Sequence, residues 1–152
     1  MSTALATSTG QADLLATFFV RDALCALDAA SVQEVIRVGP VTPVHYAPGE
    51  VVGIFNLRGR IVTIVDIGQL LGFAAAIPGP DSRIFIIEDR NEFVGLLVDR
   101  VDEVVEVERQ HWQAPPANVP WGQARFFQGV RRARGRVVTI LDPGPILAEG
   151  VQ

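Results

Sequence analysis

The sequence contains no lysine, and all 13 of its basic residues are arginine. With 17 acidic residues the formal net charge is −4, which argues against a nucleic-acid partner because such partners select a basic surface. Cys25 is the one cysteine, so an internal disulfide is excluded and a reducing, cytoplasmic compartment is expected. No apolar run reaches the roughly 18 residues of a membrane span, and the first dozen residues lack the features of a signal peptide.

Residues with obvious chemistry are also few. His45 and His111 have no second histidine, cysteine or carboxylate at metal-ligand spacing, so we expect surface or loop positions and no metal. Cys25 lies in an apolar stretch and is interpreted as a buried, inert thiol. No glycine-rich phosphate loop is present. These residues alone give no indication of a metal or a cofactor.

What the chain does contain is a repeated segment. Gly59–Leu71 returns as Gly135–Leu147, with eight of the thirteen positions identical. Half of the chain separates the two copies, which predicts two similar lobes. Proline and glycine interrupt short apolar runs throughout, and this pattern favours strands over helices.

The expected architecture is mainly β, with five strands per lobe. We expect lobe one at about 14–72, a linker at 73–82 and lobe two at about 83–147, with a disordered tail at 1–13 and a short tail at 148–152. Five short strands can curl into a small barrel, which removes exposed strand edges. The predicted strands are Leu14–Val20, Leu24–Leu27, Ser31–Val38, Val51–Leu57, Ile61–Val65, Arg83–Glu88, Phe93–Val98, Val101–Glu108, Phe126–Val130 and Val137–Leu141.

A second, weaker repeat relates Val32–Val38 to Val101–Val107. Both copies place a carboxylate, Glu34 or Glu103, on an otherwise apolar strand face. Such a group must sit at a bulge, pair with an arginine or lie on an edge strand. The alternative interpretation is a charge at the border of a groove that binds a partner.

Asp66 and Asp142 close the two copies of the first repeat, and each begins an Asp-x-Gly sequence. One interpretation is an aspartic-protease dyad, in which two carboxylates share a proton. The favoured interpretation is helix capping, with Asp66 before a short helix Ile67–Leu71 and Asp142 before a turn Pro143–Leu147. A third hypothesis is a two-barrel module that binds a ligand at the lobe junction.

Asn56-Leu57-Arg58-Gly59 is predicted to form a hairpin turn, with Gly59 in the left-handed region. Turn chemistry does not require Leu57 or Arg58 there, and an exposed arginine on a rigid turn is a typical recognition anchor. In the long proline-rich loop, Trp112 and Trp121 either cover the lobe junction or face a partner.

Three segments together resemble the CheW family of chemotaxis coupling proteins. Val32-Gln33-Glu34-Val35 is similar to the family's V-Q-E-[IV]. Gly53–Asp66 is similar to its G-V-x-N-L-R-G-x-[IV]-V-P-[IV]-V-D, and Gly95–Val101 to its G-[IL]-x-V-D-x-V. The resemblance covers about Thr17 to Leu147.

The resemblance implies two five-stranded SH3-like barrels packed on a shared core. It implies a non-enzymatic adaptor that joins the cytoplasmic tip of chemoreceptors to the regulatory domain of a CheA-type histidine kinase, recruited to membrane-associated arrays without inserting into the membrane. By this resemblance the receptor-binding residues are Val32, Gln33, Glu34, Val35, Gly53, Asn56, Leu57 and Arg58.

Overall fold

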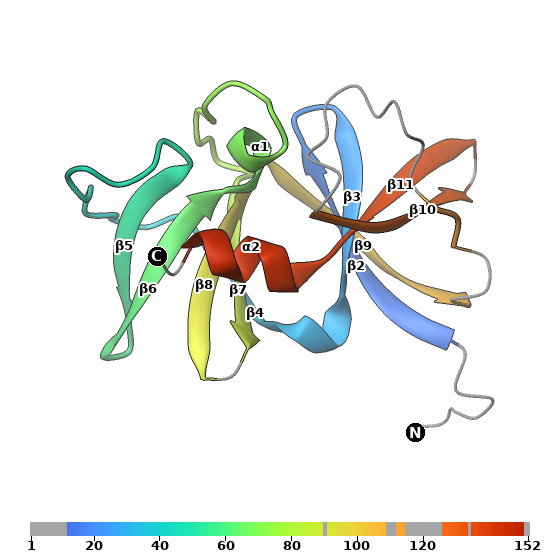
Figure 1. Ribbon diagram of the computed structural model, residues 1–152, viewed down its shortest axis with the longest axis horizontal. Coiled ribbons are helices and arrows are strands. Elements are labelled where there is room, and N and C mark those ends of the chain that lie inside the picture. Colours follow the sequence, from blue (N-terminus) through green and yellow to red (C-terminus); the bar gives the residue numbers. More distant parts are fainter. Residues whose placement is uncertain (1–11, 90, 109–111, 115–125, 134, 151–152) are drawn as a thin grey trace.

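The computed structural model describes residues 12–89, 91–108, 112–114, 126–133 and 135–150. The chain is mainly β and forms two five-stranded sheets (Figure 1). Sheet one has the order β10-β11-β3-β2-β9. Its strands are β2 (Ala12–Val20), β3 (Ala23–Asp28), β9 (Arg100–Glu108), β10 (Phe127–Ala133) and β11 (Arg136–Leu141).

Sheet two has the order β4-β7-β8-β6-β5. Its strands are β4 (Val32–Arg37), β5 (Val51–Leu57), β6 (Arg60–Asp66), β7 (Arg83–Asp89) and β8 (Glu92–Val98). In both sheets one inner pair is parallel, β11 with β3 and β6 with β8, and the other pairs are antiparallel. The two sheets therefore have the same topology, and all ten predicted strands are present.

The division into consecutive lobes was wrong. We expected 14–72 and 83–147 each to form a lobe, but hairpin β2–β3 belongs to the sheet of β9, β10 and β11. Hairpin β7–β8 in turn lies between β4 and β6. Each sheet is thus completed by a hairpin from the other half of the chain. Closure of the sheets into barrels stays a prediction.

The short connections explain this exchange. Only Asp99 separates β8 from β9, and η1 (Ala29–Ser31) is the whole link between β3 and β4. A hairpin reversal needs a loop of at least two residues with the right turn geometry, which a single residue does not provide. The chain therefore runs onward from β8 into the other sheet, and η1 carries it across from β3 to β4.

A shared core joins the two sheets. One apolar cluster takes Phe18 and Leu27 from sheet one, Phe85 and Leu96 from sheet two, and side chains of both helices. Smaller clusters lie on each sheet alone. In Figure 1, helix α2 (Pro143–Gly150) crosses the region between the sheets, and it contacts β6, β7 and β8. The implied packing on a shared core is therefore confirmed.

The capping predictions are also confirmed. The Asp66 carboxylate accepts from the Gly68 N–H at 3.0 Å and begins helix α1 (Ile67–Leu70). The Asp142 carboxylate accepts from the Gly144 N–H at 3.0 Å in the same way. The helix after Asp142 is longer than the predicted turn Pro143–Leu147, because α2 continues to Gly150. Pro143 and Pro145 lie in the first turn, where a missing N–H costs no helix hydrogen bond.

Candidate functional site

The candidate site joins the two edges of sheet two. β4 carries Val32-Gln33-Glu34-Val35 and β5 ends at the Leu57-Arg58-Gly59 turn, yet these strands lie at opposite ends of the sheet order. The guanidinium of Arg58 forms an ion pair with the carboxylate of Glu34. The sheet must therefore curl until its edges approach each other, as a barrel requires. The Arg58 side chain is 69% exposed and that of Glu34 is 34% exposed, so both remain accessible to a partner.

Turn geometry fixes Arg58 in this place. Arg58 and Gly59 both have positive φ, 49° and 87°, as expected for the two central residues of a type I′ hairpin turn. The Asn56 side-chain oxygen accepts from the Gly59 N–H at 2.8 Å. Gly59 was predicted to be left-handed, and this is confirmed. The left-handed conformation of Arg58 was not foreseen, because arginine rarely adopts it.

Glu34 meets all three of the conditions that can each allow a carboxylate on an apolar strand face. Its strand is an edge, the register with β7 shifts between Val32 and Glu34, and Arg58 supplies the opposite charge. Burial alternates along β4, with Gln33, Val35 and Arg37 exposed and the residues between them half-buried. Val35 is 45% exposed, and because neighbouring residues on a strand project to opposite faces, its side chain points away from that of Glu34.

Gly53 lies where the backbone leaves no room for a side chain. It is buried, and a Cβ there would lie 2.3 Å from the carbonyl oxygen of Thr42. Backbone hydrogen bonds between Thr42 and Ile54, at 2.9 and 2.8 Å, hold the two segments this close. Of the eight predicted receptor-binding residues, those that the structure leaves exposed are Gln33, Val35, Asn56 and Arg58, while Val32, Glu34 and Leu57 are half-buried.

The carboxylate of Asp66, a candidate for catalysis, is occupied by structural contacts. Besides the Gly68 N–H, its carboxylate accepts from the Ala76 N–H at 2.7 Å and pairs with Arg21 at 3.3 Å. Asp142 follows β11 of sheet one and caps a different helix, and no hydrogen bond among the described residues joins the two carboxylates. The aspartic-protease hypothesis therefore has no support. Sequence reasoning missed Arg21.

The structure also places several of the remaining single residues. Cys25 is buried, and burial raises the pKa of its thiol to about 12, so it is not a nucleophile at neutral pH. His45 lies exposed in a turn, whereas His111 and Trp121 fall outside the described residues. Trp112 is half-buried and packs against the apolar cluster of sheet one. The described residues contain no cluster able to hold a metal, and no helix among them could cross a membrane.

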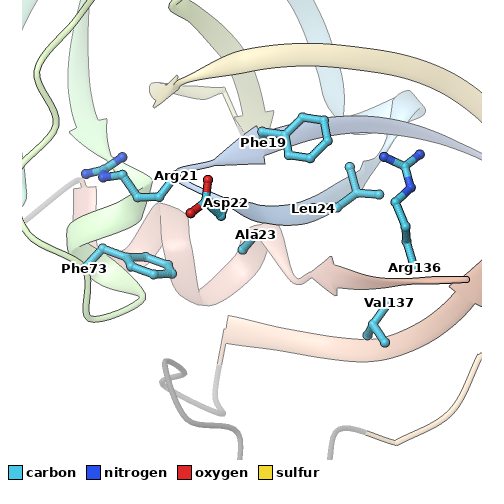
Figure 2. Close-up of a pocket in the computed structure, with 8 residues that line it drawn as sticks. All are labelled: Phe19, Arg21, Asp22, Ala23, Leu24, Phe73, Arg136 and Val137. Carbon is cyan, nitrogen blue, oxygen red and sulfur yellow. The ribbon is translucent and has the colours of Figure 1, made fainter.

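A pocket of about 620 Å³ bears on the ligand-binding hypothesis. It lies at the β2–β3 turn, beside Phe73 and the start of β11 (Figure 2). Much of its wall is apolar, and Arg21 directs its guanidinium away from Leu24 and Arg136. Arg21 and Arg136 are both already paired, with Asp99 at 3.1 Å and with Asp102 at 3.6 Å. The pocket therefore offers few free polar groups for fixing a small ligand.

Comparison with known proteins identifies the family to which this architecture is similar. The CheW-like domain family matches residues 15–150. The chemotaxis protein CheW of Rhizobium meliloti is 32% identical over 128 residues, covering 84% of this chain and 83% of that protein. The chemotaxis protein CheW of Thermotoga maritima is 29% identical over 133 residues, covering 88% and 86%.

The fold agrees with the sequence relationship. The crystal structure of the scaffolding protein TtCheW from Thermoanaerobacter tengcongensis superposes with a TM-score of 0.81 at 27% identity, covering 90% of this chain and 88% of that one. The family match spans nearly the whole chain, including both sheets and both helices. The chain therefore belongs to the CheW-like family.

Proposed function

We propose that this protein is a non-enzymatic adaptor that couples chemoreceptors to a CheA-type histidine kinase. Its relatives are named as chemotaxis and scaffolding proteins, and they match over most of their length. The described residues hold no catalytic carboxylate pair and no metal cluster that would favour an enzyme instead. An adaptor needs rigid, exposed recognition groups rather than a reactive centre.

The observation that carries this proposal is the ion pair between Glu34 and Arg58. It brings the V-Q-E-V strand and the N-L-R-G turn into one surface, where the two edges of sheet two meet. An exposed arginine on a rigid turn suits a protein partner, since such anchors often dominate interface energy. We assign the cytoplasmic tip of a chemoreceptor to this surface, and the kinase regulatory domain to another part of the molecule. Binding to both would recruit the protein to membrane-associated arrays.

Calorimetric titration with a receptor-tip fragment tests the assignment. Arg58→Ala should weaken receptor binding at least tenfold, while the thermal midpoint changes little because exposed ion pairs contribute less than about 1 kcal/mol. Arg37→Ala is the matched control, since Arg37 is an exposed arginine at the end of β4, the strand that carries Glu34. The proposal fails if no receptor tip and no kinase regulatory domain from the same organism binds the wild-type protein.

A further inference from the structure

The two sheets differ at one equivalent interior position. Phe55 pairs with Val62 between β5 and β6, and Arg131 pairs with Val138 between β10 and β11. Val62 and Val138 occupy the same position in the repeated segment. Arg131 in sheet one therefore stands where sheet two has Phe55, which packs against an apolar cluster. The symmetry of the fold predicts an apolar residue, and the chain has a guanidinium.

The Arg131 side chain points toward the apolar interior of sheet one. Residues directly opposite in an antiparallel pair project to the same face, and Val138 is only 6% exposed within its apolar cluster. The Nε of Arg131 is buried and has no hydrogen-bond partner. A buried donor without a partner is costly, and more so when it carries charge. The guanidinium therefore has hydrogen-bonding capacity that the described residues leave unused.

A groove gives access to this position. It has a volume of about 350 Å³ and lies where β9 and β10, the two edges of sheet one, come together. One wall carries the carboxylates of β9 and the other carries arginines of β10 and β11, over an apolar floor. The charged lining residues are Asp102, Glu103, Glu106, Arg131, Arg132 and Arg136.

The acidic groups of the chain do not satisfy Arg131. Asp102 pairs with Arg136 at 3.6 Å and accepts from Thr17 at 3.3 Å, and no ion pair between described residues includes Arg131. The segments outside the described residues contain no Asp or Glu at all. No described carboxylate therefore pairs with Arg131.

We propose that Arg131 anchors a docking groove for a protein segment that carries an acidic side chain next to a basic one. Two nitrogens of a guanidinium can match the two oxygens of a carboxylate. The adjacent basic residue would face the acidic wall of β9, whereas a free polyanion such as phosphate would be repelled by that wall. The strands β9, β10 and β11 that line this groove belong to the other sheet from β4 and β5 and lie on the far side of the molecule from the β5 turn (Figure 1), so the groove does not include the assigned receptor residues.

Nuclear magnetic resonance of the arginine Nε–H groups tests this groove with a defined probe. Titration with the peptide acetyl-Glu-Arg-amide should shift the Arg131 signal saturably, and acetyl-Gln-Arg-amide should bind at least tenfold more weakly. Arg131→Phe identifies the signal and should abolish saturable binding. This variant introduces the residue that sheet two uses at the same position, so we expect the thermal midpoint to be kept or raised.

Matched variants separate this groove from the receptor surface. Arg37→Gln, on sheet two, and Arg58→Ala should both keep full affinity for acetyl-Glu-Arg-amide, even where Arg58→Ala loses the receptor. The groove assignment is overturned by equal affinity for the glutamate and glutamine peptides, by tighter binding of inorganic phosphate than of acetyl-Glu-Arg-amide, or by unchanged binding to Arg131→Phe. If Arg131→Phe does not fold, Arg131→Gln is titrated instead, and it should likewise lose saturable binding of acetyl-Glu-Arg-amide.

Discussion

Arg21 Nη2 lies 3.3 Å from Asp66 Oδ2, and this contact links the two sheets. Arg21 belongs to the β2–β3 turn of sheet one, while Asp66 ends β6 of sheet two and its side chain is only 2% exposed. The same guanidinium pairs with Asp99 at 3.1 Å and donates to the Ala74 carbonyl at 2.6 Å. Asp99 is the single residue between β8 and β9, so Arg21 holds together the point where the chain crosses between sheets.

Replacing Arg21 by methionine should lower the free energy of unfolding by about 3 kcal/mol, because removing one partner of a buried pair leaves the other charge uncompensated. Urea unfolding monitored by tryptophan fluorescence measures this loss. The control is Arg37→Met, an exposed site at which substitution should cost within about 0.5 kcal/mol. A loss below about 1 kcal/mol for Arg21→Met would mean that the Gly68 and Ala76 N–H groups alone satisfy Asp66.

Gly53→Ala should destabilise the fold by about 2 kcal/mol or more. The new Cβ would overlap the Thr42 carbonyl at 2.3 Å, and backbone atoms cannot rotate aside as a flexible side chain can. Gly79→Ala is the matched control, since a Cβ there meets nothing within 4 Å. Thermal unfolding of the two variants distinguishes them, and equal midpoints would show that the 39–50 loop can move away from β5 at little cost.

Local features of this fold followed from the sequence, while its strand pairing did not. Short apolar runs bounded by proline and glycine located the ten strands, and the Asp-x-Gly sequences located both helix starts, because those signals depend on neighbours in the chain. The repeat showed that β6 and β11 are equivalent, but equivalent strands can pair within one half or across both halves. The decisive information was the single-residue connection at Asp99, which sequence reasoning did not use.

The candidate site was predictable to a similar degree. The turn at Asn56–Gly59 and the strand at Val32–Val35 could be proposed, because both are short contiguous sequences. That Glu34 pairs with Arg58, and that Gly53 is buried beneath Thr42, depends on how the sheet curls. Arg131 was not predicted, since only the register with Val138 shows that its side chain faces inward.

Stability should fall at alkaline pH because of Cys25. Burial raises the pKa of the folded thiol from its ordinary 9.0 to about 12, so the unfolded chain loses its proton first. The stabilising contribution is therefore complete below about pH 9 and is lost as the pH rises toward 12, at about 1.4 kcal/mol per pH unit. The chain has no lysine, and arginine keeps its charge throughout, so few other groups titrate in this range.

Urea unfolding at pH 8.5 and 10.5 measures this effect, with an expected loss of about 2 kcal/mol for the wild type. Cys25→Ala should be less stable at neutral pH, because it leaves a small cavity, but its stability should change much less between the two pH values. Identical pH profiles for the two proteins would mean that another group controls the alkaline loss.

The exchange of hairpins predicts that neither half of the chain folds alone. A fragment ending at Gly79 would contain hairpin β2–β3 without β9 and β11, which flank it in sheet one, and would lack β7 and β8 from the middle of sheet two. Its exposed strand edges and half-formed core cannot offset the entropy of ordering the chain. Fragments 1–79 and 80–152 should each give the narrow amide shifts of an unfolded chain, and should become folded when mixed in equal amounts. Independent folding of fragment 1–79 would contradict the interleaved topology and would favour two consecutive lobes instead.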